Sequence, residues 1–168
     1  MAEDTPLGIP AAEFYPNIED VVKTPEEATS LLIQKQQDLK NYKSIEYQLV
    51  EKRQRLLKNR PGVQGDLDAV KRIGKMTDQG ETKCQFPLAD SLYSTAVLDK
   101  TSRVALWLGA NLLVEYTLEE AQQIYQESLD SLDKQLKETE EAMMFARNQI
   151  TVTEVAVTRL ANFIAKSK

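Results

Sequence analysis

The C-terminal third of the chain carries an unbroken apolar stripe. Counting alternately four and three residues from Leu118 to Ile164 gives fourteen positions, of which eleven are apolar. Neither Gly nor Pro interrupts residues 117–165, and Thr117 with Glu120 forms a capping box at the start. A stripe this long predicts a coiled-coil helix, of about 47 residues and roughly 70 Å. Its positions are Leu118, Gln122, Tyr125, Leu129, Leu132, Leu136, Thr139, Met143, Ala146, Ile150, Thr153, Val157, Leu160 and Ile164.

A second stripe predicts another long helix over residues 24–78. Thr24 suits the N-cap, Pro25 suits the first helical position, and Glu27 completes a capping box. The apolar positions are Ala28, Leu32, Leu39, Tyr42, Leu49, Leu56, Val63, Leu67 and Val70. Four charged residues fill the same seam and make it imperfect: Lys35, Glu46, Arg53 and Arg60.

Pro61 interrupts this second stripe. It lacks the N–H of one helical hydrogen bond and clashes with the preceding turn, so the helix either kinks there or ends and restarts. Because the same spacing continues through Val63, Leu67 and Val70, we favour a kinked helix.

Residues 81–116 follow a different, two-residue period. Alternating apolar, β-branched and aromatic positions of this kind predict strands. Polar or glycine-containing turns at 89–91, 99–102 and 109–111 divide the block into four strands, which make two successive hairpins. With the hairpins as their connection, the two predicted helices of matched length are expected to pack antiparallel.

Residues 24–168 are expected to form a single domain. They follow an extended or partly ordered tail at 1–23, which carries three prolines.

Two hairpins cannot cover both of their faces or pair all of their edges. We therefore predict that the block is an assembly element joined to other chains; the alternative is a local mini-core without a partner. The candidate assembly residues are Phe86, Leu88, Leu92, Tyr93, Val97, Val104, Leu106, Trp107, Leu108, Leu112 and Val114.

Composition narrows the function classes. The chain has 168 residues, a net charge of -5, no histidine and a single cysteine, Cys84. A chain with a negative net charge is not expected to bind the negatively charged phosphate backbone of nucleic acids. Without His, the commonest general base and the His-bearing zinc sites are excluded, and one Cys allows neither an intrachain disulfide nor a CxxC site. We expect no catalytic activity, no cofactor, no metal and no membrane span, and we expect the cytosol as compartment.

Several motifs resemble the prefoldin family, and specifically its eukaryotic alpha-class subunits. They are the segments 8–14 (GIPAAEF), 18–21 (IEDV), 88–93 (LADSLY), 106–111 (LWLGAN), 114–116 (VEY) and 119–121 (EEA). The resemblance spans roughly residues 8–164, nearly the whole chain.

This resemblance implies a fold and a function. The fold is mainly α: a long antiparallel two-helix coiled coil with two central β-hairpins that join an inter-subunit β-barrel. The function is that of a subunit in a heterohexamer of two alpha-class and four beta-class chains. Prefoldin binds unfolded actin, tubulin and other clients without ATP and transfers them to the cytosolic group II chaperonin.

Client contact is expected at the distal ends of the two helices, where apolar residues exceed a single stripe. The candidates, called the tip residues below, are Leu31, Leu32, Ile33, Val152, Val155, Val157, Leu160, Phe163 and Ile164. Alternatively, these side chains complete the coiled coil or pack on the N-terminal tail. The competing function is that of a structural coiled-coil scaffold or tether.

Overall fold

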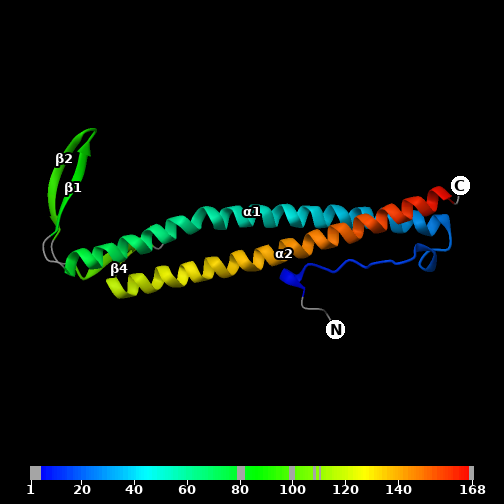
Figure 1. Ribbon diagram of the computed structural model, residues 1–168, viewed down its shortest axis with the longest axis horizontal. Helices are drawn as coiled ribbons and strands as arrows, with labels where there is room; N and C mark the ends of the chain where they lie inside the picture. The colour runs from blue at the N-terminus through cyan, green and yellow to red at the C-terminus, as the bar shows by residue number, and fades with distance from the viewer. Residues whose placement is uncertain (1–4, 79–81, 99–100, 108, 110, 167–168) are drawn as a thin grey trace. The chain divides into compact units, whose positions relative to one another are not determined.

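The computed structural model describes residues 5–78, 82–98, 101–107, 109 and 111–166. Its elements are two 3-10 turns, η1 (Pro6–Gly8) and η2 (Ile18–Asp20), the helices α1 (Pro25–Asp78) and α2 (Leu118–Lys166), and four strands between them (Figure 1). The strands are β1 (Thr82–Ala89), β2 (Leu92–Leu98), β3 (Arg103–Trp107) and β4 (Leu113–Thr117). The predicted fold class, mainly α with two central hairpins, is confirmed. None of the described helices combines the length and apolarity needed to cross a membrane.

The chain divides into two compact units. Unit 1 comprises Met1–Leu56 and Lys134–Lys168, and unit 2 comprises Leu57–Asp133. Within unit 1, α1 and α2 run antiparallel: Glu46 pairs with Arg147, and Arg53, seven residues later, pairs with Glu140, seven residues earlier. The core of this unit contains Tyr42, Leu49, Ala142 and Ala146.

The predicted seams are confirmed by burial. All fourteen positions counted along α2 are buried or half-buried, and so are the seam positions of α1 from Ala28 to Val70. Two polar positions of α2 lie deepest, with Thr139 0% and Thr153 1% exposed. The Thr139 hydroxyl donates to the Gln135 carbonyl at 2.6 Å, and that of Thr153 to the Gln149 carbonyl at 2.7 Å. Since each hydroxyl finds its acceptor in its own helix, burial leaves no unsatisfied donor.

The charged side chains in the α1 seam form ion pairs with oppositely charged side chains at the edge of the seam. Glu46 accepts from Arg147 at 2.7 Å and Arg53 donates to Glu140 at 2.8 Å. Lys35, 8% exposed, lies 3.7 Å from Asp38 and 3.8 Å from Glu13 of the tail. The apolar stems cover the seam while the charged ends find partners, so the coiled coil tolerates these residues.

Both predicted capping boxes form. In α1 the Glu27 N–H donates to the Thr24 hydroxyl at 3.3 Å, and the Thr24 N–H donates to the Glu27 carboxylate at 3.3 Å. In α2 the Glu120 N–H donates to the Thr117 hydroxyl at 3.2 Å, and the Thr117 N–H donates to the Glu120 carboxylate at 2.9 Å. Each box satisfies amide donors that a helix start leaves without a partner.

Pro61 lies inside α1, which continues without a break. The alternative of two separate helices is therefore wrong. The proline removes the hydrogen bond to the carbonyl of Leu57, and the boundary between the two units in α1 falls between Leu56 and Leu57. In unit 2, Leu67 and Val70 of α1 are buried at 2% and 5% exposure, so burial continues after the proline.

The strands form two separate antiparallel ribbons. In the first, Phe86 opposes Ser94 and Pro87 opposes Tyr93, with an irregular register between Pro87 and Ala89. In the second, Leu106 opposes Val114 and Trp107 opposes Leu113. The first ribbon turns at Ser91, which has a φ of 64°. In the second, Gly109 adopts a φ of 89°, a conformation that favours glycine.

Candidate assembly and client-binding surfaces

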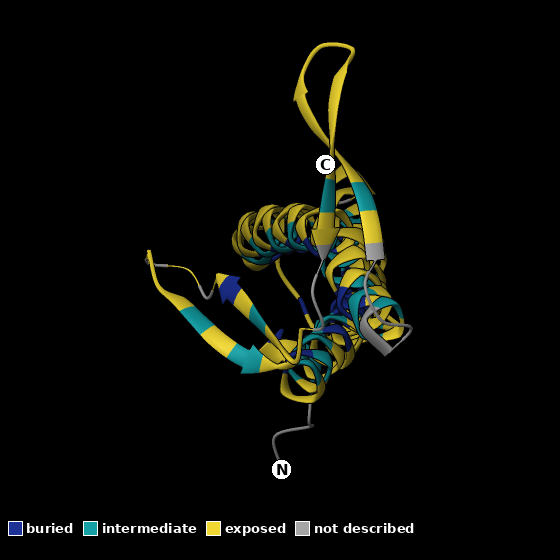
Figure 2. Ribbon diagram, turned by 90° about the vertical axis from the view of Figure 1, so that its left-hand side faces the viewer, coloured by how far each residue is buried: buried dark blue, intermediate teal, exposed yellow. Residues whose placement is uncertain are grey.

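Most of the β1–β2 ribbon is exposed (Figure 2), and large apolar residues are among its exposed positions. Residues directly opposite each other share a face, so Phe86 and Ser94 lie on one face and Tyr93 and Pro87 on the other. Phe86 is 59% exposed and Tyr93 60%. Leu88, Leu92 and Val97, also predicted for assembly, are exposed as well. A two-stranded ribbon with no buried residue among its described side chains has no core of its own.

The β3–β4 ribbon has one covered and one open face. Leu106 is 7% exposed and forms a cluster with Val70 of α1 and Ala121 of α2. Val104 packs against this cluster and Val114, opposite Leu106, is half-buried. Part of the predicted assembly set thus belongs to a core within the chain, as the mini-core alternative expected.

The open face of this ribbon carries Trp107 and Leu113, which are cross-strand partners. They are 67% and 51% exposed, and the neighbouring Leu112 is 54% exposed. The alternating pattern did not single out Leu113 as an assembly residue. An antiparallel register in which Leu106 opposes Val114 places Leu113 opposite Trp107, and this signal could have identified it. Leu108, another predicted assembly residue, lies outside the described residues. The solvent-facing apolar surface of the second ribbon is therefore centred on the Trp107–Leu113 pair.

Of the nine tip residues, only Ile33 and Val155 are exposed, at 63% and 36%. Leu160 is fully buried in a cluster with Ala28 and with Ile18 and Val22 of the tail. The same cluster half-buries Leu31, Leu32, Phe163 and Ile164, while Val152 and Val157 are half-buried elsewhere on α2. Five of the nine tip residues thus belong to a cluster that includes the N-terminal segment, as the alternative interpretation expected.

The tail is held by polar contacts as well. The Tyr42 hydroxyl donates to the Pro10 carbonyl at 3.1 Å, and the Ala12 N–H donates to the Gln149 side-chain oxygen at 2.8 Å. Arg159 donates to the carbonyls of Tyr15 at 2.5 Å and Pro16 at 2.9 Å. The Lys35 amine lies 5.4 Å from the centre of the Tyr15 ring, within the range of a cation–π contact.

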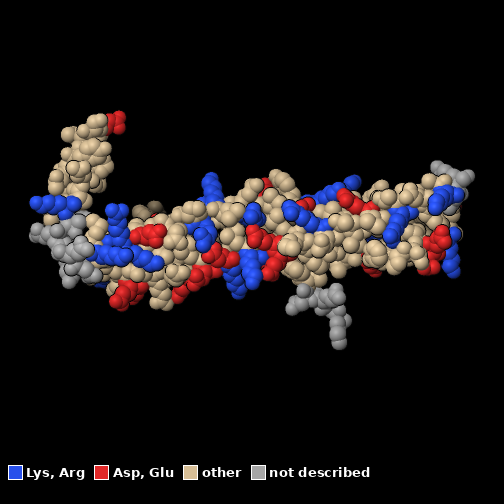
Figure 3. Space-filling view, in the orientation of Figure 1, with Lys and Arg blue, Asp and Glu red and all other residues tan. Residues whose placement is uncertain are grey.

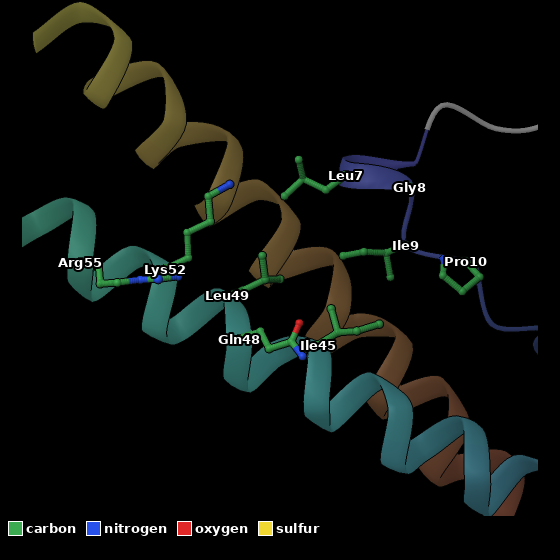
Figure 4. A pocket seen from close by; sticks show the side chains of 9 residues that line it. All are labelled: Leu7, Gly8, Ile9, Pro10, Ile45, Gln48, Leu49, Lys52 and Arg55. Atoms are coloured by element: carbon green, nitrogen blue, oxygen red, sulfur yellow. The ribbon is translucent and has the colours of Figure 1, made fainter. Parts of the chain in front are cut away.

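A hollow of about 410 Å³ lies between the start of the tail and α1 (Figure 4). Leu7 and Ile9 of the tail and Ile45 and Leu49 of α1 provide apolar walls, and Lys52 and Arg55 add positive charge. The hollow is open to solvent, and its lining includes no acidic side chain, so it offers no acid–base pair for catalysis.

Charges are mixed along the helices rather than gathered into one basic patch. Figure 3 shows Lys and Arg interspersed with Asp and Glu over the helical surface, whereas the β1–β2 ribbon is mainly uncharged. This agrees with the net charge of -5. The helical surface therefore lacks, on the face shown, the continuous basic stripe typical of nucleic-acid binding.

The sequence is similar to known proteins over most of its length. The family profile described as "Prefoldin subunit" matches residues 42–163. Prefoldin subunit 3 of Mus musculus and that of Homo sapiens are each 34% identical over 96% of this chain and 84% of their own length. Probable prefoldin subunit 3 of Dictyostelium discoideum is 31% identical over 95% of this chain and 80% of its length.

A solved structure supports the fold. Filamentous prefoldin from Methanocaldococcus jannaschii superposes with a TM-score of 0.51 at 18% identity, covering 75% of this chain and 94% of that one. At this identity the match shows the fold alone. The family profile and the sequence relatives go further and confirm the resemblance noted from the motifs. The chain belongs to the prefoldin family.

Proposed function

We propose that this chain is a subunit of a heterohexameric prefoldin of two alpha-class and four beta-class chains. In this proposal the complex binds unfolded actin and tubulin without ATP and delivers them to the cytosolic group II chaperonin. Family membership supports a co-chaperone subunit that assembles with other prefoldin subunits. The work of the chain is binding rather than catalysis, and the cytosol is its compartment.

The observation that carries the assembly step is the exposed apolar surface of the two ribbons. Phe86 and Tyr93 leave opposite faces of β1–β2 open, and Trp107 with Leu113 leaves one face of β3–β4 open. Large apolar side chains gathered on ribbons with unpaired edges are typical of a subunit interface. We assign assembly to these exposed residues and to Leu88, Leu92, Val97 and Leu112. Leu106 and Val104 support the ribbon from inside.

Client binding is assigned to the tip residues of unit 1. Ile33 and Val155 offer apolar surface directly, and Leu31, Leu32, Leu160, Phe163 and Ile164 belong to the cluster that includes Ile18 and Val22 of the tail. Scattered aliphatic contacts without a fixed polar pattern suit weak binding to many unfolded chains. The tip is thus a binding surface whose accessible area depends on the position of residues 5–23.

The test is reconstitution of the chain with five further prefoldin subunits, followed by an aggregation assay. The expected result is a heterohexamer that suppresses the aggregation of denatured actin without ATP and passes the actin to the chaperonin. A complex that forms but leaves aggregation unchanged would contradict the holdase function and favour the scaffold alternative. Failure to co-purify with other prefoldin subunits would contradict the assembly step itself.

A further inference from the structure

The N-terminal segment packs against Tyr42 of α1 and Gln149, Arg159 and Leu160 of α2, and this surface of unit 1 is called the groove below. Only some side chains of the segment are buried against it. Ile9, Ile18 and Val22 are buried at 4%, 6% and 3% exposure. Phe14 and Val21, between or beside them, are 57% and 46% exposed. The groove therefore takes three separated aliphatic anchors, half-buries Ala12 and Tyr15 between them, and leaves other side chains such as Phe14 largely exposed.

The hydrogen bonds that Tyr42, Gln149 and Arg159 make with the tail are directed at its peptide backbone, whereas Lys35 contacts the side chains of Glu13 and Tyr15. Tyr42 and Arg159 donate to carbonyl oxygens of the tail, and Gln149 accepts from the Ala12 N–H. Every polypeptide offers such carbonyls and, except at proline, such N–H groups. These contacts therefore fix an extended chain in place without requiring a particular sequence.

The tail makes few hydrogen bonds of its own. Residues 9–15 belong to no helix or strand, and the two flanking 3-10 turns have three residues each. Its order thus depends on the anchors and on the backbone contacts with α1 and α2. A segment with so little internal structure opens locally more easily than the helices that hold it.

We infer that the groove lined by Tyr42, Gln149, Arg159 and Leu160 is a binding site for an extended, aliphatic segment of non-native polypeptide, and that residues 5–23 are its built-in occupant. The inference rests on the proposed client-binding function and adds to it the form of the ligand and a competitor within the chain. Lys35, beside Glu13 and Tyr15, adds a preference for an acidic or aromatic residue near the middle of the segment.

Competition follows from this geometry. A ligand in solution can bind only those molecules whose tail has left the groove. Its apparent dissociation constant is therefore the intrinsic dissociation constant divided by the fraction of open molecules. Releasing the tail should therefore tighten binding, by about tenfold if the closed form is populated ten times more than the open one.

The first experiment uses the full chain assembled with its partner subunits. Its probe is a fluorescein-labelled peptide with the sequence of residues 5–23, and its readout is fluorescence anisotropy. The tail-release variant carries Ile9→Asp and Val22→Asp. The matched control carries Ala11→Asp and Val21→Asp, which place the same two charges at exposed positions of the same segment. Helix content by circular dichroism is compared for all three complexes.

The release variant is expected to bind the probe about tenfold or more tightly than wild type, while the control matches wild type. Equal affinity in all three complexes would overturn the inference. Adding Arg159→Ala to the release variant should weaken the probe about tenfold, the equivalent of one or two lost charge-assisted hydrogen bonds. Adding Arg147→Ala, which removes a cation that pairs with Glu46 instead, should not. If Arg159→Ala and Arg147→Ala weaken probe binding equally, recognition of the peptide backbone by Arg159 would be overturned.

A measurement on the wild-type complex avoids dependence on the variants. Saturating amounts of the peptide, synthesised with heavy isotopes, should accelerate deuterium exchange in residues 5–23 of the chain. Unchanged exchange under saturation would show that the peptide binds elsewhere and would overturn the inference. The same complexes are also tested with denatured actin. If wild type suppresses aggregation but the tail variants fail the peptide tests, the inference alone is wrong. If wild type suppresses nothing, the proposed function is wrong.

Discussion

Arg60 and Asp133 form a two-point ion pair in unit 2. The Arg60 Nε donates to one carboxylate oxygen at 2.6 Å and its Nη2 donates to the other at 3.0 Å. The guanidinium lowers the pKa of Asp133 through this hydrogen bond. In unit 1, Arg53–Glu140 and Glu46–Arg147 are similar pairs between α1 and α2. The charged residues that make the α1 seam imperfect therefore help to specify the antiparallel register.

Charge reversal tests this register. Glu46→Arg should lower the free energy of unfolding, since it removes an exposed pair, with a contribution of about 0.2–1 kcal/mol, and places two cations together. Arg147→Glu should do the same with two anions. The double variant restores opposite charges and is expected to recover most of the loss in urea unfolding. A double variant no more stable than either single change would contradict pairing between these two positions.

The capping box of α2 predicts a specific acid sensitivity. The backbone N–H and then the hydroxyl of Thr117 lower the pKa of Glu120 from its ordinary value of 4.5. A carboxylate with a lowered folded-state pKa contributes stability that is present above its unfolded pKa and is lost as the pH falls through the folded pKa. Wild type should therefore lose part of its stability below about pH 4.5 through this group.

Glu120→Gln keeps an acceptor in the capping box but removes this titration. Its melting temperature should fall less steeply with acid than that of wild type. Glu119→Gln is the control, because the Glu119 side chain makes no hydrogen bond to the described residues. Equal slopes for wild type and Glu120→Gln below about pH 4.5 would contradict a role for the carboxylate charge in capping.

Local patterns predicted some features and missed others for physical reasons. The seam from Leu118 to Ile164 follows from helical periodicity, which each turn repeats. Alternation identified Leu106 as facing apolar surroundings, but alternation does not say whether the chain itself or a partner provides them. The contact between Ala12 and Gln149 joins residues 137 apart, and no local pattern encodes it. For the same reason the burial of Leu160 beneath the tail remained one of two alternatives.

The open face of the second ribbon yields an assembly prediction. Trp107→Ser should weaken association with partner prefoldin subunits by about thirtyfold or more, the effect of losing a well-buried interface Trp. Helix content should remain, because Trp107 is 67% exposed within its own chain. Leu106→Asp is a poorer test, since it disrupts the core shared with Val70. Met144→Ser, at an equally exposed apolar position outside the hairpins, serves as control.

Size-exclusion chromatography of the co-expressed subunits provides the readout for these variants. Normal hexamer yield from Trp107→Ser would place the interface elsewhere. Loss of hexamer from both Trp107→Ser and Met144→Ser would indicate that general loss of apolar surface, rather than the ribbon face, limits assembly.

Glycines inside α1 leave room for stabilisation. A Cβ added at Gly65 meets no atom within 4 Å, so Gly65→Ala should raise the free energy of unfolding by roughly 0.5–1 kcal/mol through helix propensity. Gly109→Ala should have the opposite effect, because Gly109 has a φ of 89° that a side chain disfavours. Chemical denaturation of the two variants beside wild type measures both. Destabilisation by Gly65→Ala would show that the position is occupied or strained in the folded protein.

Leu160 provides the sharpest test of the packing between the tail and the helices. Its side chain is fully buried against Ile18, Val22 and Ala28, so Leu160→Ala leaves a cavity and should cost about 2–5 kcal/mol in the free energy of unfolding. Leu57→Ala deletes the same atoms at a position 42% exposed and should change stability by less than about 1 kcal/mol. Because Ile18 and Val22, which precede α1, belong to the same buried cluster as Leu160, its truncation should also accelerate hydrogen exchange in residues 18–22. Loss of stability with unchanged exchange there would mean that Leu160 is buried by the helices alone.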